Sequence, residues 1–421
     1  MSFYSADSPV WHPYTQMHNT EIIPIVSGKG AYVYDEQGNR YIDAVASWWT
    51  NLHGHAHPYI ANAIAAQANK LEQVIFAGFT HEPAEQLAKK LLARIPFHQK
   101  IFYTDNGSTA VEVAIKMVLQ YWGNKGEDRK KIICFRDAYH GDTFGSMSVS
   151  ARGVFTDPFQ KLLFDVEFID TPNYTNETEI LEQLHTLLTS KKDIAAFIFE
   201  PLVLGSAGML MYKAELLNKL IAMCKEHTVL TISDEVMTGF GRTGKFLAVD
   251  HCENKPDIIC LSKGITGGFL PFAATTCTSE VYNAFLSEER VKMLFHGHSY
   301  TANPLGCAAS IASLEVFEQE NTLAQIARIE KQHTLFAESI KESKAVKEIR
   351  QQGTILALEL QTGDATGYLN NIRDKAYRFF IDRKIILRPL GNVIYILPPY
   401  CISDADLQEV YTAISDFIET V

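Results

Sequence analysis

The sequence has 421 residues, of which 47% are hydrophobic, 21% are charged and 11% are aromatic. This length corresponds to roughly two to three domains of about 150 residues each, and the ordinary globular composition excludes a disordered, collagenous or coiled-coil chain. The formal net charge is −11 and no basic patch is visible, which argues against nucleic acid as a partner because an acidic surface repels a phosphate backbone.

The first element expected in chain order is a hairpin, in which residues 31–34 and 41–42 flank a turn at residues 35–38. Further along, short apolar runs alternate with helical stretches. This alternation is typical of a mainly parallel sheet with helices on both faces, so it predicts one large α/β domain. The apolar runs are residues 100–104, 131–135, 194–199, 229–233, 257–261 and 272–277.

The last third of the chain has a different pattern, which predicts a smaller α+β domain that ends in an amphipathic helix. Ser403 and Asp406 form a capping box at the start of that helix, and an apolar stripe follows. The other expected elements are a strand at residues 354–360, a helix near residues 370–383, and short runs at residues 385–387 and 393–397. We therefore divide the chain into an N-terminal segment that packs with the small domain (residues 1–48), a large domain (residues 49–315) and the small domain (residues 316–421).

Polar residues follow three of the apolar runs, and in open α/β sheets ligands bind outside the carboxyl ends of the strands. Asp-Asn-Gly-Ser-Thr at residues 105–109 opens a helix, where free N–H groups suit a phosphate, although an ordinary helix cap has the same residues. Asp234 ends another run, and a buried carboxylate needs either a structural Arg or Lys or a cationic ligand atom. Lys263 precedes glycines and is either a solvated surface lysine or a desolvated nucleophile with a lowered pKa that forms a Schiff base.

These three features together match what pyridoxal 5′-phosphate (PLP) requires from a protein. A lysine binds the aldehyde, an aspartate keeps the pyridine nitrogen protonated, and a helix N-terminus anchors the phosphate. Tyr139 follows another of the strands, which puts an aromatic ring at the same edge of the sheet to stack on the cofactor. The sequence therefore predicts a PLP site.

With these residues the chain resembles the class III aminotransferases of PLP fold type I. The motifs occur in order over most of the chain, and they imply PLP-dependent transamination and a large domain with a mainly parallel, seven-stranded sheet covered by helices. The motifs are Asp-Asn-Gly-Ser at residues 105–108, Tyr-His-Gly at 139–141, Glu-Pro at 200–201, residues 234–244, Leu-Ser-Lys-Gly at 261–264, and residues 296–300 with Asn-Pro at 303–304.

The resemblance also implies a role for each site residue. Lys263 is the Schiff-base lysine, Asp234 holds the pyridine nitrogen, and Tyr139 completes the catalytic set by stacking on the ring. Ser299 matches the position whose hydroxyl reaches the phosphate from the neighbouring subunit, which implies a homodimer with shared active sites. The remaining expected residues are Gly107 and Ser108 for the phosphate and Tyr14, Trp48, Gly297 and Arg388, together with Tyr139 and Lys263, for the substrate.

A second set of motifs resembles the members of this family that act in biotin biosynthesis. They imply transfer of an amino group from S-adenosylmethionine to 8-amino-7-oxononanoate. The long aliphatic chain of that acceptor needs an apolar tunnel with a guanidinium at its far end, which Arg388 supplies. The motifs are Trp-His-Pro-Tyr-Thr-Gln-Met at residues 11–17, Ser-Trp-Trp at 47–49, residues 139–145, and Arg-Pro-Leu-Gly at 388–391 with residues 394–400.

Two positions depart from this pattern and leave the amino donor open. His298-Ser299 stands in place of Pro-Thr, and Leu204 stands in place of a Gln near the cofactor hydroxyl. Another class III aminotransferase that uses lysine, ornithine or a polyamine as donor is therefore the alternative. A catalytically idle PLP-fold protein is a further alternative, although every expected reactive residue is present.

Two other patterns are discounted. Gly-x-Gly-x-x-Gly at residues 239–244 matches a dinucleotide motif, but residues 245–249 read as extended and not as the helix that such a site requires. Three alternating histidines lie in an expected loop without carboxylate or cysteine ligands, so we expect no metal site. They are His53, His55 and His57.

The seven cysteines are scattered without a Cys-x-x-Cys pair, so we expect reduced thiols and not a disulfide framework or a zinc site. Residues 1–10 lack the apolar segment of a secretory signal peptide, and the apolar runs are too short to span a bilayer. We therefore expect a cytoplasmic protein that acts on small molecules and does not contact a membrane.

Overall fold

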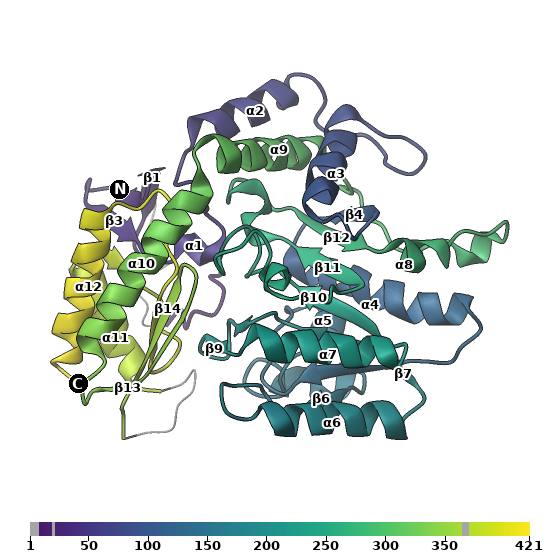
Figure 1. The fold of residues 1–421 in the computed structure, drawn as a ribbon. Helices are drawn as coiled ribbons and strands as arrows, with labels where there is room; N and C mark the ends of the chain where they lie inside the picture. Colours follow the sequence, from purple (N-terminus) through teal and green to yellow (C-terminus); the bar gives the residue numbers. More distant parts are fainter. Residues whose placement is uncertain (1–7, 19–21, 364–369) are drawn as a thin grey trace.

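The computed structural model describes residues 8–18, 22–363 and 370–421, and Figure 1 shows the path of the chain through them. Residues 1–7, and with them most of the segment on which the expected absence of a signal peptide rests, lie outside this description. Among the helices of the described ranges, none is both long enough and apolar enough to cross a bilayer. All seven cysteines are free thiols, and all but Cys401 are buried.

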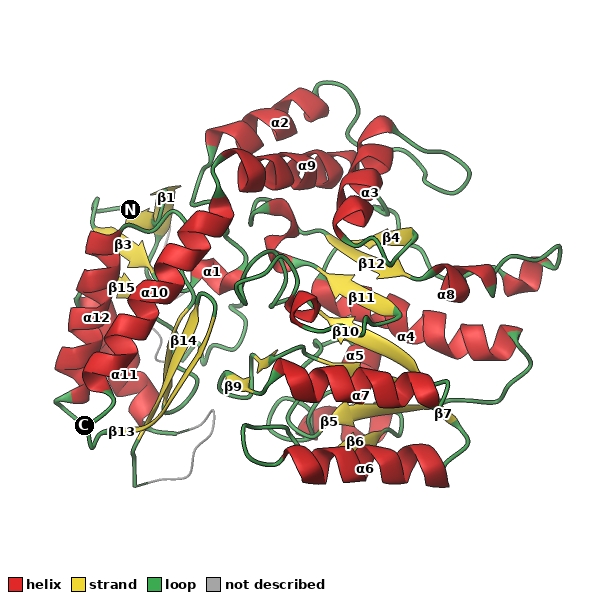
Figure 2. Cartoon of the chain, viewed as in Figure 1, coloured by secondary structure: helices red, strands yellow, loops and turns green. Residues whose placement is uncertain are grey.

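A seven-stranded sheet forms the centre of the larger part of the molecule (Figure 2). In chain order its strands are β4 (Lys100–Thr104), β5 (Lys131–Phe135), β6 (Glu167–Ile169), β7 (Ile194–Phe199), β10 (Leu230–Asp234), β11 (Ile258–Leu261) and β12 (Ala273–Cys277). They lie side by side in the order β4-β12-β11-β10-β7-β5-β6. Only β12 runs antiparallel to its neighbours within this sheet. The mainly parallel sheet inferred from the alternating apolar runs is thus confirmed.

Helices cover both faces of this sheet. The helix α4 (Gly107–Asn124) packs on one face, and α6 (Glu177–Ser190) and α7 (Ala214–Glu226) pack on the other (Figure 1). Along β5, Ile132 and Cys134 belong to the apolar cluster of α4, whereas the alternate residues belong to the cluster of α6 and α7. This burial on both faces explains why the strands read as continuous apolar runs.

The two ends of the chain meet in the smaller part of the molecule, where the purple and yellow segments of Figure 1 lie together. A four-stranded sheet contains β1 (Ile25–Lys29), β2 (Tyr32–Asp35), β3 (Arg40–Asp43) and β15 (Ile385–Ile386). The expected hairpin is confirmed as β2 and β3, and β15 pairs in parallel with β3. The N-terminal segment therefore pairs with the last third of the chain, while the division at residues 48 and 315 stays a prediction.

The rest of this part is a three-stranded sheet with three helices. Its elements after residue 354 lie close to the expected positions, whereas its first helix and first strand were not predicted. Its elements are α10 (Thr322–Ile340), β13 (Val346–Gln352), β14 (Ile355–Leu360), α11 (Ile372–Asp382), β16 (Val393–Ile396) and α12 (Asp404–Ile418). The expected cap of α12 is half correct. The Ser403 hydroxyl accepts a hydrogen bond from the N–H of Asp406 (3.1 Å), but the Asp406 carboxylate accepts from the Tyr32 hydroxyl (2.6 Å), which joins α12 to β2 and does not complete a capping box.

Short elements connect these parts. They are α1 (Ala46–Trp49), α2 (Pro58–Ala68), α3 (Glu82–Arg94), α5 (Phe144–Ser148), β8 (Val203–Leu204), β9 (Leu210–Met211), α8 (Ser279–Asn283), α9 (Pro304–Gln319) and the 3₁₀ helices η1 (Asp157–Leu162), η2 (Ala248–His251), η3 (Lys263–Thr266) and η4 (Arg290–Lys292). The helices α2 and α3 pack on α9, above the β4 edge of the sheet in Figure 1. Residues 245–249 were expected to be extended, but residues 245–247 form bends and residues 248–249 begin η2.

Candidate active site

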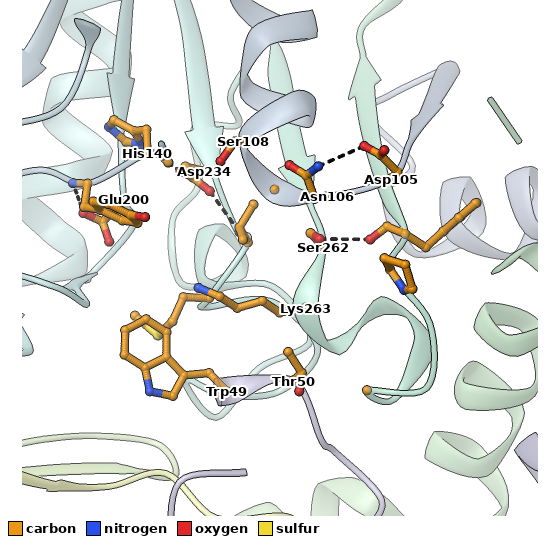
Figure 3. A pocket seen from close by; sticks show the side chains of 18 of the residues that line it. Trp49, Thr50, Asp105, Asn106, Ser108, His140, Glu200, Asp234, Ser262 and Lys263 are labelled. Atoms are coloured by element: carbon orange, nitrogen blue, oxygen red, sulfur yellow. Dashed lines mark hydrogen bonds and ion pairs between the residues drawn. The ribbon is translucent and has the colours of Figure 1, made fainter. Parts of the chain in front are cut away.

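A cavity of about 530 Å³ opens at the carboxyl ends of the parallel strands. Residues that follow β4, β5, β7 and β11, and the last residue of β10, line it (Figure 3). The structure brings together the residues that the sequence assigned to the cofactor on this chain. They are Gly107, Ser108, Tyr139, Asp234 and Lys263.

Lys263 begins η3 with a φ of 45°, a left-handed conformation that is rare for a residue with a side chain. Its Nζ atom lies 4.4 Å from the ring centroid of Trp49, and Figure 3 shows the two side chains together in the cavity. Burial lowers the pKa of the Lys263 amine from 10.5 to about 8, against the opposing charges of Asp234 and Glu200. The lysine is therefore the desolvated amine that the sequence suggested as one of two possibilities.

Asp234 is almost fully buried at the end of β10, and its partner is a histidine. The Nδ1 atom of His140 lies 2.7 Å from Asp234 Oδ2, and the N–H of Val236 donates to Oδ1 (3.0 Å). These contacts fix the carboxylate at the cavity wall. The sequence had left a structural Arg or Lys and a cationic ligand atom as partners and did not identify His140.

Two further buried carboxylates lie near Asp234. Glu200 lines the cavity and accepts from the N–H groups of Tyr139 (2.9 Å) and Gly205 (3.0 Å), and burial raises its pKa to about 7. Glu235 follows Asp234 directly but does not line the cavity, and it accepts from the Thr238 hydroxyl and from two N–H groups of η2. Adjacent residues at a strand end point to opposite sides, so only Asp234 of this pair serves the cavity.

The start of α4 forms a cup for an anion. The Asn106 side chain accepts from the N–H of Thr109 (3.0 Å) and caps the helix, whereas the N–H groups of Gly107 and Ser108 have no acceptor inside it. A Cβ atom on Gly107 would lie 2.7 Å from Val236, and one on Gly141 would lie 2.1 Å from the Ser108 hydroxyl. A side chain at either position would therefore displace a neighbour, and the cup, the buried amine and Asp234 fit the phosphate, aldehyde and pyridine nitrogen of PLP.

A second cavity of about 300 Å³ adjoins the first and shares Trp49, Tyr139 and Lys263 with it. It brings together the predicted substrate residues Tyr14, Trp48 and Arg388, although they come from opposite ends of the chain. The Arg388 guanidinium carbon lies 4.2 Å from the Trp48 ring centroid, and the Tyr14 and Trp48 rings are 5.8 Å apart. An aromatic wall with one guanidinium suits an aliphatic chain that carries a carboxylate.

Other residues of this cavity were not predicted as site residues. Phe155 packs edge-on against Tyr14 (5.7 Å) and lies in no motif, so no sequence signal identified it. The Tyr14 hydroxyl also donates to the carboxylate of Asp142, which does belong to the quoted motif at residues 139–145. Tyr395 accepts from the indole N–H of Trp49 (3.0 Å) and holds that ring in place.

Two predicted residues lie elsewhere on this chain. Gly297 and Ser299 belong to an exposed loop between η4 and α9, and neither lines either cavity. The carbonyl of Ser299 accepts from the Gln73 side chain (2.6 Å). Leu204, at the position where Gln was expected, is fully buried in β8 and does not line the cofactor cavity.

The discounted patterns have structural roles. The three histidines contact Ser313 (3.1 Å), Asp43 (2.8 Å) and Glu320 (2.9 Å) respectively, and no cluster of three metal-ligating side chains occurs in the part of the chain that the structure describes. Arg242 of the glycine-rich loop is buried, and its guanidinium donates to the carbonyls of Pro398 (2.7 Å) and Asn51 (3.1 Å). That loop therefore ties the two parts of the molecule together.

Known proteins resemble this chain over nearly its full length. Enzymes of Synechococcus elongatus and Geobacter sulfurreducens, both named adenosylmethionine-8-amino-7-oxononanoate aminotransferase, are 46% and 40% identical to it, over 98% of this chain and 99% and 96% of their own. The crystal structure of the enzyme of that name from Methanocaldococcus jannaschii is 38% identical, with a TM-score of 0.92 and 97% of each chain covered.

An amine transaminase from an uncultivated Pseudomonas species, solved in its PLP-bound form, is 31% identical with a TM-score of 0.89 over 97% of each chain. The family model for aminotransferase class III matches residues 14–418, which is almost the whole sequence. The chain belongs to the class III aminotransferases.

Proposed function

We propose that this protein is a PLP-dependent aminotransferase of biotin biosynthesis that converts 8-amino-7-oxononanoate to 7,8-diaminononanoate, with S-adenosylmethionine as amino donor. The observation that carries the proposal is that Lys263 lines both the cofactor cavity and the aromatic cavity that contains Arg388. A reactive amine thus faces a space suited to a long carboxylate. The names of the full-length relatives support the same reaction.

The residues of the first cavity would hold PLP, which when bound supplies an electron sink for charge that develops at the substrate carbon. The N–H groups of Gly107 and Ser108 would bind the phosphate, and Tyr139 would stack on the ring. Asp234, oriented by His140, would keep a proton on the pyridine nitrogen. Lys263 would accept a proton from the substrate carbon, because an amine with a pKa of about 8 is partly neutral at physiological pH.

The second cavity would select the acceptor. Its aromatic walls, Tyr14 and Trp48, would exclude water from the aliphatic chain, and the Arg388 guanidinium would pair with the terminal carboxylate through two parallel hydrogen bonds. The donor and the acceptor would use this space in turn. The amino group leaves the donor in the first half-reaction, and the keto carbon of the acceptor receives it in the second.

The active site would be completed by a second copy of the chain. Ser299 and Gly297 lie outside the cavities of their own chain, and large apolar side chains of the same loop are exposed, among them Phe295 and Tyr300. A homodimer would cover these side chains and bring Ser299 to the partner's phosphate. Mixing the Lys263→Ala protein with the Ser299→Ala protein tests this, because a mixed dimer with shared sites has one intact site. If the activity of the mixture never exceeds the sum of the activities of the two separate proteins, the sites are not shared.

The thiols support a proposal for the compartment. Seven free cysteines without a disulfide fit a reducing environment, so we place this enzyme in the cytoplasm. Its distribution between cell fractions, with a periplasmic or secreted protein as reference where the host has one, checks this placement.

The experiment that tests the function is a donor screen with 8-amino-7-oxononanoate as acceptor. We expect S-adenosylmethionine to convert the bound cofactor to its amine form, which shifts its visible absorbance, and the keto acid to reverse the shift. Lysine, ornithine and a polyamine are the comparison donors. If one of them replaces S-adenosylmethionine, the donor assignment is wrong, and if the keto acid never restores the absorbance, the acceptor assignment is wrong. No absorbance change with any amine would indicate an idle PLP-fold protein.

A further inference from the structure

The segment that leads from β3 into the aromatic cavity has an unusual backbone. Ala46, Ser47 and Trp49 have φ values of 49°, 62° and 66°. Such left-handed conformations are strained for residues with a side chain, and they persist only where surrounding contacts enforce them. Trp48 lies between them, so this strained segment carries both tryptophans of the cavity wall.

Asp43, the last residue of β3, holds the start of this segment. Its carboxylate is 1% exposed, accepts from the N–H groups of Ser47 (2.7 Å) and Val45 (3.3 Å), and lies 2.8 Å from Nε2 of His55. His55 holds the other end, because its backbone exchanges two hydrogen bonds with Gly30 in the turn between β1 and β2. The Asp43–His55 contact thus closes a loop of twelve residue steps around the two tryptophans.

The loop fixes two contacts in the active site. Trp48 lies under the Arg388 guanidinium (4.2 Å), and Trp49 lies beside the Lys263 amine (4.4 Å). Arg388 is anchored by the same sheet, because Ile386 of β15 pairs with Asp43. Asp43 therefore lies where two parts of the chain come together. One is β15, which ends two residues before Arg388, and the other is the segment that carries the two tryptophans.

Asp43 and His55 do not line the aromatic cavity. They line a separate cavity of about 670 Å³ that also includes Ser47 and Trp48. Trp48 is therefore a partition between two spaces, with substrate expected on one side and the Asp43–His55 contact on the other. Trp48 contacts Tyr14 and Arg388 on the substrate side, and among the described residues a space lies on its other side, so its position depends on the backbone segment that carries it.

We propose that Asp43 and His55 are positioning residues that hold the Trp48–Trp49 wall against Arg388 and thereby set the fit of the acceptor's aliphatic chain. This inference rests on the proposed function for the identity of the acceptor. Neither residue touches the substrate or the cofactor. Without the contact, Ser47 relaxes to an ordinary backbone conformation, and the ring of Trp48 moves toward the empty space behind it.

The chain offers a matched control. Asp35 ends β2 in the same sheet, is 3% exposed, and accepts from the N–H groups of Gln37 (3.1 Å) and Asn39 (2.8 Å), so it also holds a turn through a buried carboxylate. It lines neither active-site cavity. Asp35→Asn therefore reports what the loss of such a carboxylate costs in stability alone.

The experiment compares Asp43→Asn, His55→Leu and His55→Gln with Asp35→Asn in the PLP-loaded enzyme. The probe is nonanoate, an aliphatic carboxylate without a reactive group, and its binding is measured by calorimetry beside kcat and KM for the keto acid. We expect Asp43→Asn and His55→Leu to weaken nonanoate binding and raise KM about ten-fold, with kcat changed less than about three-fold. His55→Gln keeps a donor and should stay near the wild type, and Asp35→Asn should lower only the melting temperature.

A third measurement needs no ligand. In the apoprotein, Asp43→Asn and His55→Leu should shift the tryptophan emission, and Asp35→Asn should not. The inference would be overturned if Asp35→Asn and Asp43→Asn changed nonanoate binding, KM and tryptophan emission equally. It would also be overturned if His55→Leu and His55→Gln weakened binding equally. If Asp43→Asn does not fold, the comparison of the two His55 variants decides. If the wild type binds nonanoate in this manner but does not aminate the keto acid, the proposed function fails and the positioning role stands.

Discussion

The two cavities of the active site are built in different ways. The residues expected to hold the cofactor follow or end strands of one sheet, so the hydrogen bonds of regular secondary structure position them. The aromatic cavity instead takes Tyr14 and Trp48 from the N-terminal segment and Arg388 from the last third of the chain. The backbone of the sheet thus positions the residues expected to carry out the reaction. The choice of substrate instead depends on side-chain contacts between distant segments. Changes in the first cavity should therefore abolish the reaction, and changes in the second should alter affinity.

The largest effect is expected for Lys263→Ala. Turnover should fall at least about 10³-fold, because the variant loses both the covalent link to the cofactor and the base. The protein should remain folded and bind PLP without a covalent bond, which absorbance and peptide mapping after borohydride reduction detect. Lys245→Ala is the matched control, since the Lys245 amine donates to the Asp250 carbonyl away from both cavities. Appreciable turnover in Lys263→Ala would refute the assignment.

The next largest effect is expected for Asp234→Asn, which is compared with Asp257→Asn at the opposite end of the sheet. Asp234→Asn should lower kcat about 10²-fold, because a neutral amide does not keep a proton on the pyridine nitrogen. Asp257 is a partly buried carboxylate that precedes β11 at the opposite end of the sheet, and it accepts from the Thr231 hydroxyl (2.7 Å). Asp257→Asn should lower the melting temperature and leave kcat and the cofactor spectrum unchanged. If the two variants had similar kcat values, the proposed role of Asp234 at the carboxyl end of its strand would be wrong.

Arg388→Ala tests the second cavity. The KM for the keto acid should rise about ten- to a hundred-fold, with kcat nearly unchanged, because a hydrogen bond to a charged group contributes about 1.5–3 kcal/mol. Arg383→Ala removes a guanidinium that stacks on Phe379 (3.6 Å) outside both cavities and serves as control. A wild-type KM in Arg388→Ala would remove its proposed role.

The sequence was sufficient for six of the seven strands of the large sheet, all but β6, and for the strand ends that line the first cavity, for a physical reason. Strands such as β5 and β7 are buried on both faces, so each reads as an apolar run whose end is marked by a polar residue. The end of the run then gives the location of the site. Strand limits shifted by only one residue, as at β10, which begins at Leu230.

What the sequence did not give depends on contacts between side chains far apart in the chain. His140 approaches Asp234 from 94 positions away, and Phe155 packs on Tyr14 from another segment. Neither contact leaves a periodic pattern in one sequence. The left-handed backbone at Ala46 and Ser47 was also unpredictable, because neither residue prefers that conformation and the contact of the Ser47 N–H with Asp43 leaves no periodic pattern in the sequence.

The smallest expected effect concerns the desolvation of Lys263. It distinguishes the two interpretations of this lysine, a desolvated amine in the cofactor cavity and a solvated surface lysine. With a pKa of about 8, the neutral fraction rises about five-fold between pH 7 and 8 and then levels off, whereas an amine with an ordinary pKa gains about ten-fold per pH unit up to pH 10. The rate of covalent PLP uptake by the apoprotein, followed by absorbance, should therefore flatten above pH 8. The same reaction of a blocked lysine in solution corrects for the titration of PLP itself. After that correction, a rate that still rises up to pH 10 would show that Lys263 is solvated. Burial is what lowers the pKa of its amine, and the charges of Asp234 and Glu200 oppose that shift, so a solvated amine would not have a lowered pKa.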